Sequence, residues 1–422
     1  MAEPTIYALA SAPGRAGVSV MRISGPDAFI IAGGLMSSVP QARGVRRILD
    51  ADGDLIDSAL ILRFEEGHSF TGEATIEIHC HGSIAIVTAL STRLEELGAT
   101  PAGPGDFTRR ALENGTLDLT QVEGLADLID AETEAQRKQA VRVFNGALGR
   151  QADLWRSDLI RAGALIEATI DFVDEDVPVD VNPEVITLLT GVLRTLQQQI
   201  DGARAAEMVR TGFEVAIVGP PNIGKSTLLN RLAGRDAAIT SEIAGTTRDV
   251  IEVRMNLGGL AVTLLDTAGV RETDDVVEQL GVTRAISRAR DADLRVFLTE
   301  EGGDPPFSPE PGDLVLLGKA DKTGGISGLT GAGVAEALDA ITVELSRRSA
   351  TAGLAIRERH RAAMILAVQF LTAAIDRVKG DGEADLIAED IRLAVRALDS
   401  IVGRVDVEDL LGEIFSSFCI GK

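Results

Sequence analysis

Cysteine and aromatic residues are scarce in this chain, and long apolar runs are missing. Cys80 and Cys419 are the only two cysteines among 422 residues, which excludes a disulfide framework and favours a reducing compartment. Aromatic residues make up 3% of the sequence, so the cores must rest mainly on Leu, Ile, Val and Ala. No apolar run reaches the roughly 18 residues of a membrane span, and the N-terminus lacks the basic-then-apolar pattern of a signal peptide. We therefore expect a cytoplasmic protein without a membrane segment.

Acidic residues outnumber basic ones, 64 against 41, which gives a formal net charge of −23. That balance argues against a protein that coats nucleic acid with a basic surface, although it is compatible with a local basic groove or a basic partner subunit. Hydrophobic residues account for 45% and charged residues for 25% of the chain, which is the composition of a globular protein. A chain of this length is expected to form two or three domains with sizeable cores.

The first part of the chain, residues 1–118, is predicted to be an α+β N-terminal domain. Its short apolar runs alternate with turns, as strands do; the clearest runs are Thr5–Ala10, Val18–Ile23, Ala59–Phe64 and Thr75–Cys80. Residues 84–97 have helical spacing and are followed by Gly98, which is a helix stop signal.

The remainder is predicted to be an all-α helical central domain with an inserted α/β domain. Residues 119–210 would form the first half of the helical domain, residues 211–348 the insert, and residues 349–422 the second half. Such insertion is tolerated because chain ends lie at domain surfaces, often close together. Within the insert, Thr299–Gly312 is acidic and holds five Gly or Pro residues between positions 302 and 309, so the helix usual in a crossover between parallel strands is disfavoured there.

Gly219–Ser226 has the sequence GPPNIGKS, which matches the P-loop pattern G-x-x-x-x-G-K-[ST]. The apolar run Phe213–Val218 precedes it and the helical segment Thr227–Leu232 follows it, which is the strand–loop–helix context that the motif requires. The alternative is a chance glycine turn, which the downstream motifs disfavour. In a P-loop, backbone N–H groups and the helix N-terminus hold phosphate oxygens, the lysine reaches the β- and γ-phosphates, and the hydroxyl ligates Mg²⁺. We predict that the loop binds GTP through Asn222, Ile223, Gly224, Lys225, Ser226 and Thr227. Ser226 is also predicted to ligate Mg²⁺, and Lys225 to be catalytic.

Two further segments stand where a GTPase senses the γ-phosphate. Asp266, Thr267, Ala268 and Gly269 follow an apolar run about forty residues after the P-loop lysine. Asp266 is predicted to hold Mg²⁺ through its water shell, and the Gly269 N–H to sense the γ-phosphate. Gly245–Asp249 reads GTTRD in the position of switch I, where Thr247 is predicted to ligate Mg²⁺ and assist catalysis. The alternative for that segment is a solvated Gly-Thr loop.

Gly318-Lys319-Ala320-Asp321 stands where a GTPase carries its guanine-reading N-K-x-D. Asp321 can accept hydrogen bonds from the N1–H and the exocyclic amine of guanine, whereas adenine offers an acceptor at the first position, so this carboxylate selects GTP. Gly318 replaces the usual asparagine, and the lost contact is expected to weaken nucleotide binding by about 1 kcal/mol. Ser327 begins the segment Ser327-Gly328-Leu329, which stands where a GTPase usually carries S-A-[KR]. Lys319 and Ser327 complete the predicted base site.

The residue after the DTAG is Val270, and not a glutamine that could orient the attacking water. The hydrolytic residue must therefore come from elsewhere, and the acidic stretch Glu272–Glu278 holds the candidates. Arg248 and Arg271 are candidates for an arginine finger, with plain surface charge as the alternative.

These motifs, together with the C-terminal FSSFCIGK of residues 415–422, closely resemble those of the MnmE (TrmE) tRNA-modification GTPases. The resemblance covers the whole chain, and its N-terminal part includes Pro13–Arg15, Arg22–Gly25 and Phe70–Glu73. It implies K⁺-stimulated GTP hydrolysis by a homodimer whose N-terminal domain binds a one-carbon tetrahydrofolate, in the 5-formyl or methylene form. It also implies a heterotetramer with an FAD-containing MnmG-type protein, the FAD being on that partner alone. The implied substrate is tRNA, whose wobble uridine receives an aminomethyl or carboxymethylaminomethyl group.

Matched residue by residue, the resemblance implies two further sites. The implied K⁺ ligands are Asn222, Ser241, Ile243 and Thr246, of which Ser241 and Thr246 also belong to the GTP site. Glu278 matches the residue that orients the hydrolytic water. The implied folate contacts are Arg22, Glu77 and Lys422, with Thr116 where the family has a lysine. Cys419 is a candidate thiolate because an ammonium close by favours ionisation; the alternative is a packed thiol.

Two other functions are compatible with the GTPase motifs. A regulatory GTPase of ribosome assembly should carry a basic RNA-binding module, which the sequence does not display. A nucleotide-binding scaffold with little turnover would agree with the altered Gly318 and Ser327-Gly328. The intact Lys225, Ser226 and Asp266 favour turnover.

Overall fold

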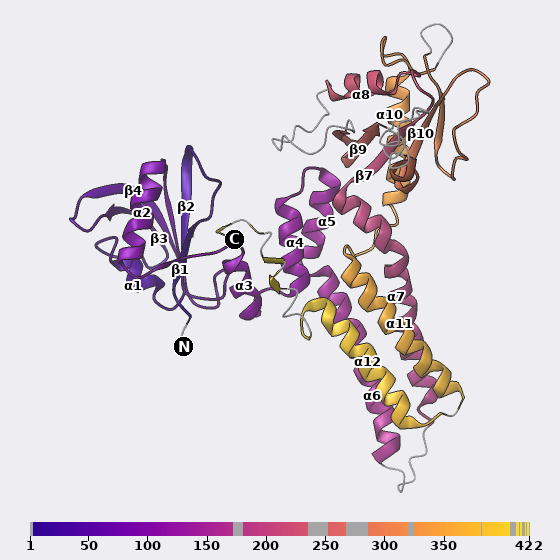
Figure 1. Cartoon of the computed structure of the whole chain (residues 1–422). Helices are drawn as coiled ribbons and strands as arrows, with labels where there is room; N and C mark the ends of the chain where they lie inside the picture. Colours follow the sequence, from indigo (N-terminus) through magenta and orange to yellow (C-terminus); the bar gives the residue numbers. More distant parts are fainter. Residues whose placement is uncertain are drawn as a thin grey trace, which may run out of the picture. The chain divides into compact units, whose positions relative to one another are not determined.

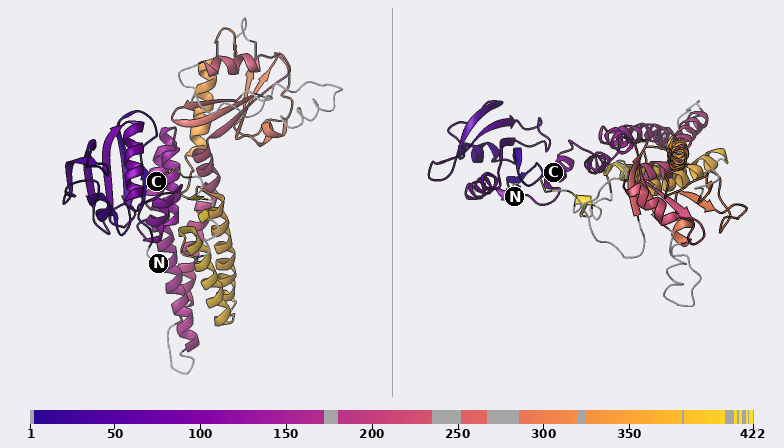
Figure 2. Two further views of the ribbon diagram at one scale, coloured as in Figure 1. Left: turned by 60° about the vertical axis from the view of Figure 1, so that its left-hand side comes forward. Right: turned by 90° about the horizontal axis from the view of Figure 1, so that it is seen from above.

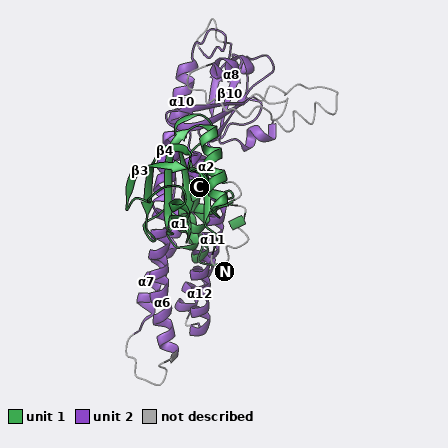
Figure 3. Ribbon diagram, turned by 90° about the vertical axis from the view of Figure 1, so that its left-hand side faces the viewer, with its two compact units in different colours: residues 1–126, 399–422 green, residues 127–398 purple. Residues whose placement is uncertain are grey.

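The chain divides into two compact units (Figure 3), unit 1 comprising residues 1–126 and 399–422 and unit 2 comprising residues 127–398. The computed structural model describes residues 3–171, 180–234, 252–266, 286–319, 325–380, 382–405, 411, 412, 414, 415, 418, 420 and 421. Every helix in this described part of the chain is too short or too polar to cross a membrane.

Unit 1 is built on a six-stranded sheet in the order β3-β4-β5-β2-β1-β6 (Figure 1). The strands are β1 (Ile6–Leu9), β2 (Ala16–Ser24), β3 (Arg43–Leu49), β4 (Leu55–Phe64), β5 (Thr75–Gly82) and β6 (Thr100–Pro101). All neighbours pair antiparallel except β1 and β6, which are parallel. The predicted strands are confirmed as β1, β2, β4 and β5. The sequence did not reveal β3, because this edge strand carries three arginines and buries only Ile48.

Four helices accompany this sheet: α1 (Ala28–Gly33), α2 (Ile84–Glu96), α3 (Asp106–Glu113) and α4 (Leu119–Ile129), the last of which crosses the unit boundary. Leu90 and Leu94 of α2 belong to one buried cluster with the inward residues of the sheet, such as Ile23 and Ile78. The core is thus aliphatic, as the scarcity of aromatic residues predicts. Near the C-terminus, Phe415 is buried with Val122 of α4.

Tyr7, the single tyrosine of the sequence, provides a test of this packing. Its hydroxyl donates to Glu95 Oε1 at 2.7 Å, and burial, reinforced by that carboxylate, raises the pKa of Tyr7 to about 12. The unfolded chain releases this proton near pH 10, so Tyr7 stabilises the fold below about pH 10, and that contribution is lost as the pH rises towards 12. Phenolate absorbance should therefore show a midpoint near pH 12 while the circular dichroism is still native. A midpoint near pH 10 in the folded protein would contradict this environment.

The helical part of unit 2 comprises α5 (Glu134–Phe144), α6 (Ala147–Asp171), α7 (Asn182–Thr211), α11 (Glu358–Lys379) and α12 (Ala384–Val402), the last of which crosses the unit boundary. Helices α6, α7, α11 and α12 lie side by side in each view (Figures 1 and 2), and α7 contacts both α6 and α11. The buried Trp155 of α6 donates its indole N–H to Thr195 Oγ1 of α7 at 2.8 Å. Segments far apart in sequence therefore build one helical framework.

The α/β part of unit 2 is inserted between α7 and α11. Its five-stranded sheet has the order β11-β10-β7-β9-β8, parallel except for the β8–β9 hairpin. The elements are β7 (Phe213–Val218), α8 (Lys225–Ala233), β8 (Glu252–Leu257), β9 (Leu260–Asp266), β10 (Leu294–Thr299), β11 (Leu314–Leu317) and α10 (Val334–Ser349). The prediction of no helix between Thr299 and Gly312 is confirmed. Phe307 of this loop stacks edge-on against Phe297 of β10, with ring centroids 5.1 Å apart, and so covers the sheet where a helix normally would.

The β8–β9 hairpin is attached to the first turn of α5. The carbonyl of Gly259 accepts a hydrogen bond from the N–H of Ala135 at 3.0 Å. Arg254 of β8 forms an ion pair with Glu132 at 2.9 Å. Thr133 and Gln136 form a capping box at the same helix end. Strand β9 ends at Asp266, and the hairpin turn at its opposite end is therefore hydrogen-bonded to helix α5 of the helical framework.

Candidate functional site

The P-loop lies between the buried strand β7 and the N-terminus of α8, in the predicted context. Gly219 has no room for a side chain, since a Cβ there would lie 2.5 Å from the carbonyl oxygen of Leu298. Asn222 and Gly224 adopt left-handed conformations, with φ of 61° and 105°; glycine takes such values without strain, and asparagine more readily than most residues. The backbone therefore turns tightly around the space in front of α8, as a phosphate-binding loop must.

Lys225 is the first residue of α8, and its side chain folds back over the loop. Its Nζ donates to the carbonyl oxygens of Gly219 and Pro220 at 2.8 and 3.0 Å, and the residue is 5% exposed. Burial lowers the pKa of Lys225, while the negative charge of Asp266 acts in the opposite direction. The lysine is thus held at the loop, where its ammonium can exchange carbonyl partners for phosphate oxygens.

Ser226 and Asp266 meet although 40 residues separate them. The serine hydroxyl donates to Asp266 Oδ2 at 2.7 Å, and Asp266 is 5% exposed. The other carboxylate oxygen, Oδ1, is buried and has no hydrogen-bond partner among the described residues. A buried acceptor without a partner is unfavourable unless a ligand or a water satisfies it. A hydroxyl and a carboxylate are the hard oxygen donors that Mg²⁺ prefers, so this pair fits the predicted magnesium site.

The two loops that the sequence predicts to read the base lie against the P-loop and its helix, since a Cβ on Gly318 would meet Ile223 and a Cβ on Gly328 would meet Leu228. Ser327 is 3% exposed, and its hydroxyl oxygen accepts a hydrogen bond from the Thr330 N–H at 3.1 Å. Lys319 has a left-handed φ of 55°, and its Nζ lies 3.9 Å from Glu300 Oε1. Strained non-glycine residues of this kind cluster at functional sites.

Arg231 of α8 binds the second loop predicted to read the base, and the sequence did not reveal this contact. Its Nε donates to the carbonyl oxygen of Gly328 at 2.6 Å and its Nη2 to that of Leu329 at 2.5 Å. An arginine in a helix carries no sign that it will bind carbonyls 97 and 98 residues away.

Eleven predicted site residues lie outside the described residues, and their roles stay predictions. They are Ser241, Ile243, Thr246, Thr247, Thr267, Ala268, Gly269, Glu278, Asp321, Cys419 and Lys422. Thr227, by contrast, is placed in the first turn of α8 with Ser226. The structure thus brings together the P-loop, Asp266, Lys319 and Ser327, all within unit 2.

In unit 1, Arg22 and Glu77 face each other on the paired strands β2 and β5. Arg22 Nε and Nη2 donate to Glu77 Oε1 at 3.1 and 2.9 Å. The guanidinium also lies 5.5 Å from the ring centroid of Phe70 and 5.6 Å from that of Phe107. Thr116 donates its hydroxyl to the carbonyl oxygen of Phe70 at 3.1 Å. Two predicted folate contacts are therefore paired and flanked by aromatic rings, and Thr116 is bound to one of these neighbours.

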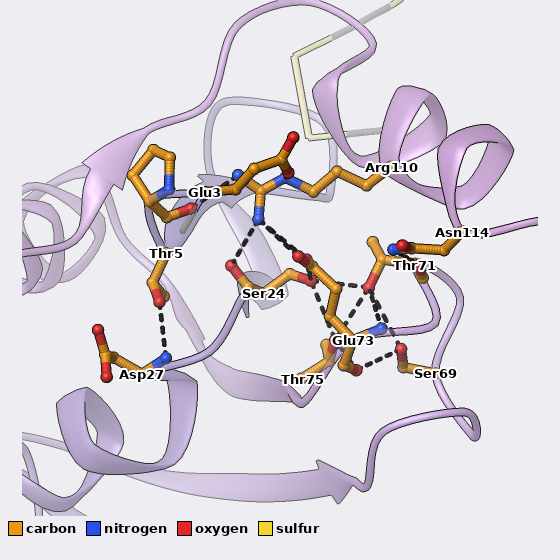
Figure 4. A network of polar contacts seen from close by, with 11 residues as sticks. Glu3, Thr5, Ser24, Asp27, Ser69, Thr71, Glu73, Thr75, Arg110 and Asn114 are labelled. Carbon is orange, nitrogen blue, oxygen red and sulfur yellow. Dashed lines mark hydrogen bonds and ion pairs between the residues drawn. The ribbon is translucent and has the colours of Figure 1, made fainter. Parts of the chain in front are cut away.

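Unit 1 also contains a polar network in which Ser24, Thr71 and Arg110 are buried (Figure 4). At its centre, Arg110 Nη1 donates to both carboxylate oxygens of Glu73 at 2.9 and 3.1 Å, and Arg110 Nη2 donates to the carbonyl oxygen of Pro4 at 2.7 Å. The hydroxyl of Ser24 donates to Glu73 Oε2 and contacts Thr71 Oγ1, both at 2.7 Å. Glu73 belongs to the FTGE motif of the sequence, but nothing in the sequence pointed to its partner, 37 residues away.

A mostly parallel sheet with a P-loop after its central strand β7, a buried lysine and a Ser–Asp pair define a P-loop nucleotide-binding domain. Two family models match the chain: the MnmE helical domain over residues 119–419 and the GTP-binding protein TrmE N-terminus over residues 5–116. The chain therefore belongs to the MnmE family of tRNA modification GTPases.

Curated relatives agree with this assignment over the full length. Proteins named tRNA modification GTPase MnmE from two strains of Cereibacter sphaeroides are 60% and 58% identical to this chain. The protein of that name from Ruegeria sp. strain TM1040 is 58% identical. Each alignment covers 99% of this chain and 100% of the relative. The family and the combined fold, an α+β domain, a helical domain and an inserted P-loop domain, are thus as the sequence predicted.

Proposed function

We propose that this chain hydrolyses GTP and, with an FAD-containing MnmG-type partner, modifies the wobble uridine of tRNAs by adding an aminomethyl or carboxymethylaminomethyl group. The supporting observation is the arrangement of Lys225, Ser226 and the unsatisfied oxygen of Asp266 around the P-loop. The 60% identity to a full-length curated MnmE protein supports the choice of tRNA as substrate.

The nucleotide roles are divided among the site residues by their chemistry. Lys225 neutralises charge on the β- and γ-phosphates, and Ser226 and Asp266 hold Mg²⁺, directly and through water respectively. Mg²⁺ supplies positive charge against the phosphate oxygens. Thr247 orders switch I on the triphosphate, and Glu278 orients the attacking water. Guanine is read by Asp321, with Lys319, Ser327 and the remaining predicted residues completing the nucleotide contacts.

K⁺ takes the part of an arginine finger in this proposal. Its ligands would be Asn222, Ser241, Ile243 and Thr246, and its charge would act when two GTPase domains pair. Asn222 is the member of this set whose placement supports the proposal, because its left-handed backbone, with φ of 61°, is part of the P-loop turn.

In this proposal, unit 1 binds the tetrahydrofolate that provides the one-carbon group. Arg22 and Glu77 form an ion pair, and the Arg22 guanidinium lies 5.5 Å from the ring centroid of the half-buried Phe70, so the pair offers polar groups and one aromatic surface suited to a one-carbon tetrahydrofolate. Thr116 and Lys422 would complete its contacts. The proposed assembly is a cytoplasmic homodimer in a heterotetramer with the partner, and the proposed domains are residues 1–118, 119–210 with 349–422, and 211–348.

We expect GTP hydrolysis to be several-fold faster in KCl than in NaCl at equal ionic strength, because the proposed ligand set is that of a K⁺ site, whose charge would act as that of an arginine finger does. Phosphate release by the full chain with Mg²⁺ is the measurement. Asn222→Gly is the informative variant, since glycine tolerates the φ of 61° while the side-chain ligand is lost. Its rates in the two salts should converge. Equal rates of the unmodified chain in KCl and NaCl would remove the K⁺ assignment.

A further inference from the structure

Gly318 is the residue that replaces the usual asparagine at the start of the base-reading loop. Its N–H donates to the carbonyl oxygen of Thr299 at 2.9 Å, and it forms an isolated parallel bridge with Ile326. Its φ does not lie in the left-handed region, so the backbone conformation alone does not demand glycine. The reason for a glycine here must be sought in the space around it.

That space is filled by Ile223 of the P-loop. A Cβ on Gly318 would lie 2.7 Å from Ile223 Cγ1 and 3.0 Å from Cδ1, closer than side chains normally approach. Ile223 is 2% exposed and belongs to the buried cluster that includes Leu228, Leu298 and Ile326. Because a β-branched side chain is restricted in χ1 and this one is surrounded, it has little freedom to move aside. Any side chain at position 318 therefore competes with Ile223.

Ile223 is part of the phosphate-binding turn itself. Its N–H donates to the carbonyl oxygen of Pro220 at 3.4 Å, and Gly224, which follows it, is the left-handed N-cap of α8. Its Cγ2 also lies 3.2 Å from the place where a Cβ on Gly219 would be. A displacement of Ile223 would consequently disturb the loop that holds the phosphates.

The second base-reading loop approaches α8 in the same manner. A Cβ on Gly328 would lie 2.5 Å from the backbone nitrogen of Leu228, and Arg231 holds the carbonyl of Gly328. Both departures from the usual GTPase motifs thus occur where a base-reading loop contacts the P-loop or its helix.

We propose that Ile223 and Gly318 form a matched pair, in which Ile223 is a positioning residue that replaces the missing asparagine. The apolar contact sets the distance between the phosphate loop and the base-reading loop. This inference rests on the proposed binding of GTP. It makes a specific claim beyond that function: asparagine at position 318 is harmful with Ile223 present and beneficial without it.

The test is a double-mutant cycle in nucleotide affinity, measured on the full chain by titration of a fluorescent GDP with Mg²⁺. Gly318→Asn alone should weaken binding at least about tenfold, because steric overpacking displaces Ile223. Ile223→Ala alone should weaken it a few-fold. The double variant, in which asparagine regains its room, should bind about fivefold more tightly than Ile223→Ala, the factor expected for one regained hydrogen bond. Asparagine at position 318 is therefore expected to weaken nucleotide binding when Ile223 is present and to strengthen it when Ile223 is replaced by alanine.

Gly191→Asn is the matched control, because a Cβ at this position of α7 meets nothing within 4 Å. It should leave affinity unchanged in both backgrounds. If the asparagine variant fails to fold by circular dichroism, Gly318→Ala takes its place in the cycle. Because it adds only the conflicting Cβ, it should weaken binding when Ile223 is present and have no effect in the Ile223→Ala background. Additive effects of the two substitutions would overturn the matched pair. Failure of the unmodified chain to bind GDP would instead overturn the proposed function.

Discussion

Replacing Lys225 by alanine is expected to lower kcat/KM for GTP hydrolysis by about 10²- to 10³-fold, the range seen when one preorganised charge-stabilising group is removed. The lysine is 5% exposed, and its Nζ is held within 3.0 Å of two P-loop carbonyl oxygens. No other described lysine or arginine side chain contacts these carbonyls. The alanine variant consequently loses the positive charge at the point where phosphate charge develops. Steady-state phosphate release with Mg²⁺ and K⁺ is the measurement.

Lys138→Ala is the matched control, because this lysine is 70% exposed and lies 3.5 Å from Glu134 on the helix α5. Its rate should equal that of the unmodified chain. Thermal unfolding of the Lys225→Ala variant should stay within a few degrees of the unmodified chain, since the buried ammonium gains no more than its two carbonyl contacts from the fold. A Lys225→Ala variant that hydrolyses GTP at the unmodified rate would mean that the P-loop is not the site of turnover.

Replacing Arg110 by alanine is expected to destabilise unit 1 by about 2–4 kcal/mol, because it leaves the half-buried carboxylate of Glu73 without its positive partner. The arginine side chain is 8% exposed and that of Glu73 is 17% exposed. The loss also frees the carbonyl oxygen of Pro4, which Arg110 binds at 2.7 Å. The unfolding transition of unit 1 should move down by about 10 °C, as measured by differential scanning calorimetry.

Two further variants serve as controls for the Arg110→Ala measurement. Arg47→Ala removes an exposed arginine of the edge strand β3 and should change the transition by less than about 0.5 kcal/mol. Arg110→Met combined with Glu73→Leu removes both charges and should recover much of the loss, because a buried pair can be exchanged for apolar residues at little cost. A single Arg110→Ala variant as stable as Arg47→Ala would show that the network in Figure 4 contributes little.

Regular elements with a clear apolar pattern could be predicted from the sequence. Residues 213–218 are predicted as a strand and observed with the same bounds as β7. They form a near-continuous apolar run bounded by Gly212 and Gly219, as in a buried parallel strand. The P-loop and the partnership of Ser226 with Asp266 were also predictable, because a motif fixes the order of elements and therefore the end of the sheet at which its residues meet.

Features that depend on contacts between distant segments could not be predicted in this way. The strand β3 carries too many arginines to display an apolar period, and only its pairing with β4 makes it a strand. The ion pair of Arg110 with Glu73 and the clamp of Arg231 on Gly328 join residues 37 and 97 positions apart. The glycine at position 318 looked like the loss of a contact, whereas its surroundings show that Ile223 occupies the space.

The central claim is that nucleotide turnover at Lys225 drives a tRNA modification. It is tested most directly by nucleoside mass spectrometry of tRNA from a strain that lacks this chain and is complemented with either the unmodified gene or Lys225→Ala. The account predicts that aminomethyl-type wobble uridines disappear in the deletion strain, return with the unmodified gene, and stay missing with Lys225→Ala. Unchanged wobble nucleosides in the deletion strain, or full restoration by Lys225→Ala, would contradict it.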